Sequence, residues 1–236
     1  MALIEVAGLK KEYRIGEETI RAVDNINLKI KKGEMIAIVG PSGSGKSTLM
    51  HLIGALDKPS KGTISINGKD ITTLTDGQAA KFRNRTIGFI FQTFNLVPTL
   101  SAEENVRLPL ALRGITGKAA NKLAKSALDS VGLKGRAKHR PNELSGGELQ
   151  RVAIARAIIN NPPIILADEP TGNLDSKTGV SIMNMLRALN RAGHTLVIVT
   201  HNKAHAKLAS RTIQFLDGKI ISDESTANRS ASQAGA

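Results

Sequence analysis

The chain contains the sequence Gly40-Pro-Ser-Gly-Ser-Gly-Lys-Ser47, which is rich in glycine and ends in lysine and serine. Glycine lets a backbone curl around an anion, because it adopts positive φ without steric cost and leaves its N–H groups accessible. Lys46 adds a mobile cation for the β- and γ-phosphates of a nucleotide, and the hydroxyl of Ser47 suits Mg²⁺. The pattern therefore predicts a phosphate-binding loop.

The residues on either side of this loop have the pattern of a strand followed by a helix. Residues 35–39 form a short apolar run, and residues 47–56 carry apolar side chains at helical spacing. The helix N-terminus would then also face the phosphates, where its N–H groups and dipole favour an anion. A simple glycine-rich turn is the alternative, and the flanking elements favour nucleotide binding over it.

Length and composition limit the classes of protein. The chain has 236 residues, enough for one domain with subdomains. It has no cysteine, which excludes disulfides and thiolate metal sites and is compatible with the cytosol. The first ten residues alternate like a strand, unlike a signal peptide, and no apolar run is long enough to cross a bilayer. We therefore expect a protein that is soluble by itself.

The net charge of +13 raises the question of nucleic-acid binding. The basic residues are dispersed along the chain, and the aromatic residues, 3% of the total, do not alternate with them as base-stacking platforms would. Solvated basic faces, with attraction to nucleotide and to an anionic membrane surface, explain the charge better. We expect no nucleic-acid partner.

The order of the expected elements indicates a parallel central sheet, because buried strands alternate with helices and such crossovers are right-handed. The expected elements are short strands over residues 1–32, a hairpin over 62–71 that turns at Asn67-Gly68, a basic helical region over 102–138, a strand over 164–167, a helix from Asp175 to Ala192, a strand over 195–199 and a helix from about Asn202. From Ser222 onward the residues are small and polar, which is typical of a disordered tail.

Two carboxylates, Asp168 and Glu169, follow the apolar strand over 164–167 directly. Ligands bind at this end of the strands in open α/β sheets. A carboxylate pair there is costly unless it holds a cation or a proton, and Mg²⁺ with a nucleotide supplies the cation. We expect Asp168 to bind Mg²⁺ together with Ser47, and Glu169 to polarise the attacking water. A helix cap followed by a surface glutamate is the simpler alternative.

His201 follows the strand over 195–199 and should emerge at the same edge of the sheet as the loop. A histidine there can donate a hydrogen bond to an oxygen of the γ-phosphate, which only a nucleoside triphosphate presents. A single histidine is more often structural, and the other four histidines are expected to be so.

A second anion site is predicted at Leu144-Ser-Gly-Gly-Glu-Leu-Gln-Arg151. Ser145 can cap a helix, and Gly146 and Gly147 leave bare N–H groups at its N-terminus. A nucleotide held by the loop of the same chain has no obvious use for this second site. We therefore expect a two-fold symmetric sandwich, in which the Ser145 helix of one chain covers the nucleotide of the other.

Together these residues resemble the ATPase subunits of ATP-binding cassette (ABC) transporters, over about residues 2–222. The matching motifs are the Walker A motif at residues 40–48, the Q-loop at Phe91-Gln92, the ABC signature at 144–148, the Walker B motif with its catalytic glutamate at 165–170, the D-loop at 172–175 and the switch histidine at His201. The residues expected to contact nucleotide are Gly40, Pro41, Ser42, Gly43, Ser44, Gly45, Lys46, Ser47, Thr48, Ser145, Gly146 and Gly147.

The resemblance implies roles for residues that spacing alone does not assign. Gln92 would reach both Mg²⁺ and the attacking water, and would couple to a membrane subunit. Tyr13 would stack on adenine, although a lone tyrosine also suits a core position. Phe91 and Phe94 would line a groove for a helix of the permease, and an ordinary core position is the alternative, which we expect for Phe89.

Within the family, residues 89–98 and 104–110 are similar to the lipoprotein-release and macrolide-export branch. Two positions depart from the usual pattern. The fifth signature residue, commonly Gln, is Glu148, and a carboxylate near a triphosphate is unfavourable unless it points away. Asn173 stands in the D-loop where Ala is commoner.

The expected function is therefore an ATPase with ATP and Mg²⁺ as cofactors, active as an ATP-dependent homodimer that drives a separate membrane permease for export or lipoprotein release. Its expected location is the cytoplasmic face of the cell membrane, where the permease holds it. A soluble ABC ATPase acting on DNA or ribosomes is the alternative.

The expected fold class is α/β. It comprises a P-loop NTPase core with a parallel central sheet, an N-terminal antiparallel β subdomain and a helical subdomain that carries the signature. We expect the ATPase domain over residues 1–222, its helical subdomain over about 93–160, and a disordered tail over 223–236.

Overall fold

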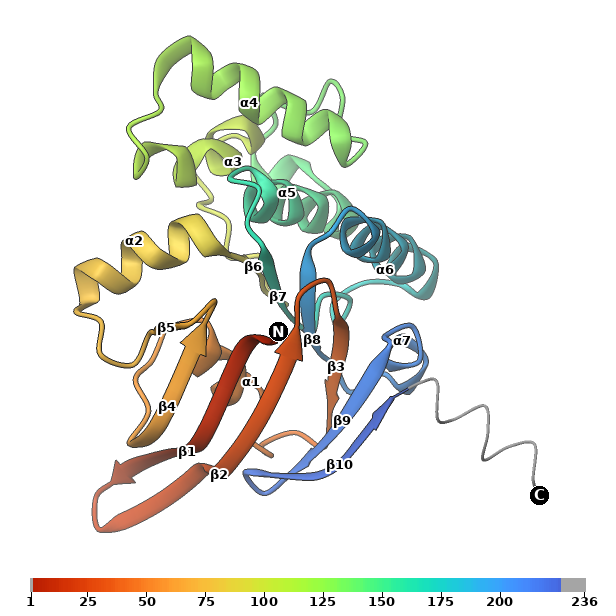
Figure 1. The fold of residues 1–236 in the computed structure, drawn as a ribbon. Coiled ribbons are helices and arrows are strands. Elements are labelled where there is room, and N and C mark those ends of the chain that lie inside the picture. Colours follow the sequence, from red (N-terminus) through yellow and green to blue (C-terminus); the bar gives the residue numbers. More distant parts are fainter. Residues whose placement is uncertain (1, 226–236) are drawn as a thin grey trace. The chain divides into compact units, whose positions relative to one another are not determined.

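The computed structural model of the chain describes residues 2–225 (Figure 1). The chain divides into two compact units, each described by itself below. The first unit contains the residues up to 80 together with those from 195 onward, and the second contains residues 81–194. The helix α2 (Asp76–Thr86) spans the boundary between them.

An antiparallel sheet in the first unit has the strand order β2-β1-β4-β5. Its strands are β1 (Ala2–Ile15), β2 (Glu18–Lys31), β4 (Lys61–Ile66) and β5 (Lys69–Asp70). The expectation of several short strands before residue 32 is wrong, because β1 and β2 form one long hairpin of 14 residues a side. The β4–β5 turn is confirmed: Asn67 and Gly68 both have positive φ, 50° and 77°, as a type I′ turn requires.

The parallel strands of the first unit carry the expected loop. The strand β3 (Met35–Val39) pairs in parallel with both β8 (Thr195–Val199) and β9 (Arg211–Leu216), and β10 (Lys219–Ser225) pairs antiparallel with β9. Two helices accompany them, α1 (Lys46–Ile53) and α7 (Lys203–Ala206). The side chains of β8 are buried, as expected of a strand inside a layered α/β unit.

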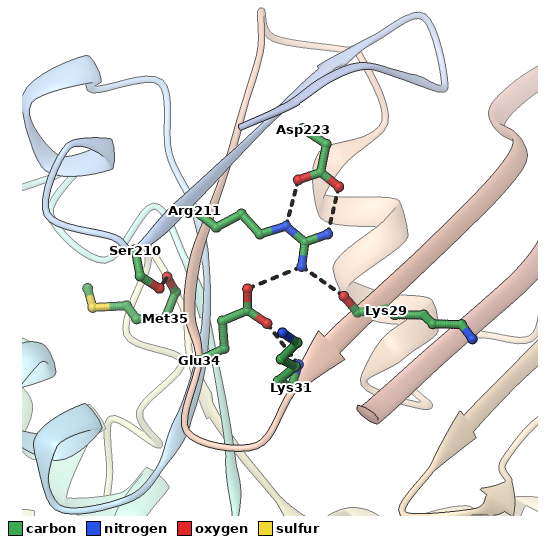
Figure 2. Close-up of polar contacts among 7 residues, drawn as sticks. All are labelled: Lys29, Lys31, Glu34, Met35, Ser210, Arg211 and Asp223. Carbon is green, nitrogen blue, oxygen red and sulfur yellow. Dashed lines mark hydrogen bonds and ion pairs between the residues drawn. The ribbon is translucent and has the colours of Figure 1, made fainter. Parts of the chain in front are cut away.

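The last strand corrects the expected start of the tail. Arg211 on β9 donates two hydrogen bonds of 2.6 Å to the carboxylate of Asp223, and its other terminal nitrogen reaches Glu34 and the carbonyl of Lys29 (Figure 2). These partners raise the pKa of Arg211 above its ordinary value, with the bond to Asp223 as the main cause. Residues 223–225 therefore belong to β10. The remainder of the expected tail, 226–236, lies outside the described residues.

The second unit combines a parallel strand pair with a helical region (Figure 1). Its strands are β6 (Ile87–Ile90) and β7 (Ile164–Asp168), and its helices are α3 (Ala102–Ala111), α4 (Gly117–Ser130), the 3-10 turn η1 (Pro141–Glu143), α5 (Gly146–Ile158) and α6 (Ser176–Arg191). The helices α3, α4 and α5 pack on one another and lie within the interval 93–160. The predicted cap at Asp175 is confirmed, since its side chain accepts a hydrogen bond from the N–H of Thr178.

Among residues 2–225, no helix has the length and the apolar character that are needed to span a bilayer.

Candidate nucleotide site

The loop over residues 40–47 is a tight turn between β3 and α1, and two of its glycines are required by close backbone approaches. A Cβ on Gly40 would lie 2.0 Å from the carbonyl oxygen of Phe215. A Cβ on Gly45 would lie 2.0 Å from the carbonyl oxygen of Ala22, and Gly45 also has a φ of +100°. No side chain fits at either position, so the backbone itself forms the surface of the loop.

Lys46 is buried, and its Nζ donates to the carbonyl of Pro41 at 2.6 Å and lies 3.4 Å from the Oγ of Ser44. The ammonium is thus folded back over the loop that it belongs to. Ser42 and Ser47 are exposed. All nine expected loop contacts lie on this one turn and the start of α1: Gly40, Pro41, Ser42, Gly43, Ser44, Gly45, Lys46, Ser47 and Thr48.

The parallel register brings His201 to the same edge of the sheet as the loop. Ile38 on β3 lies opposite Val199 on β8, and the N–H of Thr200 donates to the carbonyl of Ile38 at 3.1 Å. The loop begins at the first residue after β3, and His201 is the second residue after β8. His201 is exposed there, as expected for a residue that meets a ligand.

Tyr13 lies on β1 and is 38% exposed, so its alternative interpretation as a core residue is wrong. Its hydroxyl donates to Asp57 at 2.9 Å, and the Nζ of Lys11 lies 4.8 Å from the ring centroid. Burial and Asp57 raise the pKa of Tyr13, and a hydrogen bond with the side chain of Thr48 acts in the opposite direction. The ring therefore lies beside the end of the loop.

In the second unit, the register of β6 and β7 brings three expected site residues to one edge. Ile90 lies opposite Ala167 in this parallel pair. Gln92 follows β6, Asp168 ends β7, and Glu169 comes next. Glu169 has a left-handed backbone, with φ of 44°, and its carbonyl accepts from the N–H of Gly172 at 2.9 Å. A non-glycine residue in this region is uncommon and often marks a functional site.

The orientation of the Gln92 side chain follows from its bonds to Asn173. The Nδ2 of Asn173 donates to the backbone carbonyl of Gln92 at 3.0 Å, and a carbonyl can only accept, so this contact fixes the Asn173 amide. Its Oδ1 then faces the Nε2 of Gln92 at 3.3 Å. The Oε1 of Gln92, the atom that a hard cation needs, is directed away from Asn173.

The chemistry of the donor set suits Mg²⁺. Among residues 2–225, no three His, Asp or Glu side chains come together, so a divalent cation would depend on other oxygen atoms. The expected ligands offer a hydroxyl from Ser47, an amide oxygen from Gln92 and a carboxylate from Asp168. Mg²⁺ typically binds through one or two carboxylates together with water and substrate phosphates.

The helix start that was predicted at Ser145 is confirmed. Ser145 is the exposed N-cap, and its Oγ accepts from the N–H of Glu148 at 3.4 Å. Gly146 and Gly147 form the first turn, and a Cβ on Gly147 would lie 2.6 Å from the Cγ2 of Thr178. The carboxylate of Glu148 turns back onto Ser145 in a capping box.

The structure thus groups the predicted residues within each unit. In the first unit the loop, Tyr13 and His201 lie together, and in the second Gln92, Asp168 and Glu169 share one edge. Sequence reasoning missed the link between Gln92 and Asn173. The one signal for this link was that asparagine stands at position 173, where alanine is commoner, but the residue type alone does not show which residue it bonds to.

Comparison with known proteins assigns the family. A sequence model of the family described as ABC transporter matches residues 23–172. An uncharacterized ABC transporter ATP-binding protein of Bacillus subtilis, YknY, is 50% identical over 93% of this chain and 95% of its own length. The macrolide export ATP-binding/permease protein MacB of Acinetobacter baylyi is 47% identical over 98% of this chain, which spans 35% of MacB.

A solved structure is equally similar. The ATP-binding cassette MJ0796 of Methanocaldococcus jannaschii, described as dimeric in a post-hydrolysis state bound to ADP and Pi, aligns with a TM-score of 0.89 at 47% identity, covering 94% of this chain and 98% of that one. The likeness of fold therefore extends over nearly the whole of both chains.

Tyr13→Ala should weaken ATP binding by roughly 1–2 kcal/mol, because the exposed ring offers a stacking face beside the loop. Tyr13→Phe removes the hydrogen bonds of the hydroxyl with Asp57 and Thr48 but keeps the ring, and should retain most of the affinity. Calorimetric titration of both variants with ATP measures this. Equal affinity of wild type and Tyr13→Ala would remove the ring from the adenine site.

Asn173→Ala should reduce the apparent affinity for Mg²⁺ in the presence of ATP by roughly two- to tenfold, because the Gln92 amide loses the bond that orients its oxygen, worth about 0.5–1.5 kcal/mol. Titration with Mn²⁺, followed by electron paramagnetic resonance, measures binding without turnover. Asn173→Asp retains an oxygen that accepts from Gln92 Nε2. Its affinity for Mg²⁺ should therefore lie between those of the wild type and Asn173→Ala. Unchanged metal affinity in Asn173→Ala would contradict the orienting role.

Proposed function

Because the chain belongs to the ABC transporter family, we propose that it is an ATP-hydrolysing transporter subunit that closes as a homodimer over two Mg²⁺·ATP and drives a separate permease. The observation that carries the proposal is that one chain has two helix starts of the kind that suits a phosphate, at the glycine-rich loop before α1 and at the exposed Ser145 cap of α5. The dimeric relative MJ0796, which binds ADP and Pi, supports the pairing.

The site residues divide the chemistry between them. Lys46 leaves the Pro41 carbonyl and pairs with the β- and γ-phosphates, and the loop N–H groups surround them. Ser47, Asp168 and Gln92 would hold Mg²⁺, which would supply neutralisation of charge on the phosphates. Glu169 accepts a proton from the attacking water, and His201 donates a hydrogen bond to the γ-phosphate.

Closure of the dimer depends on contacts that exist only in the closed state. ATP can shift the equilibrium only by as much as it binds that state better. The N–H groups of Gly146 and Gly147 and the hydroxyl of Ser145 provide this difference when they reach the γ-phosphate held by the partner chain. Hydrolysis removes the bridging phosphate, so the dimer reopens.

The permease would dock on the segment that follows β6. Phe91 stacks on Phe89, with ring centroids 5.5 Å apart and planes within 4°. Arg156 on α5 donates to the carbonyls of Phe94 and Asn95, both of which have left-handed backbones. The segment is therefore held in shape before any partner binds, which lowers the entropy cost of binding.

A neighbouring buried side chain holds the rest of the segment. Asn105, fully buried on α3, bonds both the N–H and the carbonyl of Val97, whose own side chain is 39% exposed. The permease would hold the chain at the cytoplasmic face of the membrane. The macrolide export named in the MacB relatives favours an exporter over a DNA- or ribosome-bound ATPase.

Glu169→Gln should bind Mg²⁺·ATP but lose turnover by roughly two to four orders of magnitude, the span typical of losing a general base. The amide cannot accept the proton, and repulsion between the carboxylate and the γ-phosphate is relieved. The variant should therefore accumulate as a dimer in ATP and stay monomeric in ADP. Light scattering combined with size-exclusion chromatography measures both states.

The matched control adds Ser145→Arg to Glu169→Gln. An arginine at the N-cap blocks the approach of α5 to the nucleotide of the partner chain, so the dimer should disappear while ATP still binds. A Glu169→Gln chain that stays monomeric at saturating ATP contradicts the sandwich, and one with wild-type turnover contradicts the role of Glu169.

A further inference from the structure

The signature helix begins with a carboxylate at the place where the proposed function requires a phosphate. We propose that Glu148 is a positioning residue that holds Ser145 in the nucleotide-free chain and weakens ATP-driven closure, with Arg136 as its counter-charge. The inference rests on the proposed function, because it concerns the group that the γ-phosphate of the partner chain's nucleotide would meet.

Glu148 binds Ser145 through three hydrogen bonds. Its Oε2 accepts from the backbone N–H of Ser145 and from its Oγ, both at 2.9 Å. The N–H of Glu148 in turn donates to the Oγ at 3.4 Å. The single hydroxyl hydrogen of Ser145 is therefore already committed to a carboxylate, and a serine hydroxyl has only one hydrogen to donate.

The Ser145 hydroxyl must consequently exchange partners when the dimer closes. To donate to a γ-phosphate oxygen, it must release Glu148 Oε2. The bond from the Ser145 backbone N–H, followed by the one from its side chain, lowers the pKa of Glu148 below its ordinary value, and Arg136 adds to this effect. The group that competes with the phosphate is thus an anion at neutral pH.

Charge acts in the same direction as the hydrogen bond. A helix N-terminus stabilises one nearby anion, and in the free chain that anion is Glu148. A triphosphate brought to the same end meets the carboxylate and is repelled by it. Glu148 therefore stabilises the open state more than the closed state, which is the condition for shifting the equilibrium.

Arg136 moderates this repulsion. Its Nε donates to Glu148 Oε1 at 3.0 Å, while Oε2 is used by Ser145. The ion pair leaves the helix start with little net charge from side chains. Loss of Arg136 should therefore weaken closure, whereas loss of the Glu148 charge should strengthen it.

The chain contains a matched control in the same geometry. At the start of α3, Ser101 and Glu104 form a second capping box, in which Glu104 Oε2 accepts from the Ser101 N–H and from its Oγ, again both at 2.9 Å. Arg107 provides the counter-charge, 3.6 Å from Glu104. The proposed function gives α3 no nucleotide, so Glu104→Gln reports the capping contribution alone.

The test compares Glu148→Gln with Glu104→Gln, each in the Glu169→Gln chain, by measuring the dimer dissociation constant in ATP by sedimentation. Glutamine can still cap the helix but carries no charge. Removing one charge at a helix N-terminus should change an equilibrium constant by about two- to fivefold. The dimer contains two such sites, so its dissociation constant should fall by roughly four- to twenty-fivefold. Glu104→Gln should leave the constant unchanged, and both variants should lose a similar, small amount of thermal stability.

Arg136→Gln supplies an independent second readout. It should weaken the dimer when Glu148 is present and have no effect when position 148 is Gln. A Glu148→Gln dimer no tighter than that of Glu104→Gln, or an Arg136→Gln effect that persists without Glu148, overturns the inference alone. A Glu169→Gln chain that never dimerises overturns the proposed function, and this inference falls with it.

Discussion

In the first unit, the arrangement of the neighbouring segments depends on close backbone contacts with the loop over residues 40–47. The carbonyl oxygen of Ala22 leaves no room for a Cβ on Gly45, and that of Phe215 leaves none for a Cβ on Gly40. The N–H of Gly218 also donates to the carbonyl of Ser44 at 2.9 Å. Two separate segments of the chain, at Ala22 and at residues 215–218, therefore hold the loop in place. On the proposed function, this preorganisation reduces the cost of binding a phosphate.

The helix starts of α1 and α5 both present backbone N–H groups, but different groups lie against them. At α1 the N-cap is Gly45, and no side chain bonds to the cap. At α5 the N-cap is Ser145, and Glu148 fills the position of an anion. On the proposed function, the start of α1 meets a phosphate held by its own loop. The start of α5 must exchange the Glu148 carboxylate for a phosphate of the nucleotide bound to the partner chain. On this account the strength of closure depends on that exchange.

Local patterns predicted most of the elements but few of the contacts between distant residues. The strand Met35–Val39, the turn at Asn67 and Gly68 and the cap at Ser145 were predictable, because each depends on a short stretch of sequence. The pairing of Arg211 with Asp223 was not, since residues far from the end of the chain decide whether small polar residues form a strand. The left-handed backbone of Glu169 and the bonds of Gln92 to Asn173 likewise depend on tertiary context.

If each nucleotide is shared between two chains, a mixture of two inactive variants should regain activity. Lys46→Ala removes the cation of the loop and keeps α5 intact, whereas Ser145→Arg blocks α5 and keeps the loop intact. Only a mixed dimer contains one complete site. Single-turnover hydrolysis of ATP by the equimolar mixture should clearly exceed that of either variant alone. If the mixture hydrolyses no more ATP than the sum of its two parts, the two anion sites do not act across a dimer.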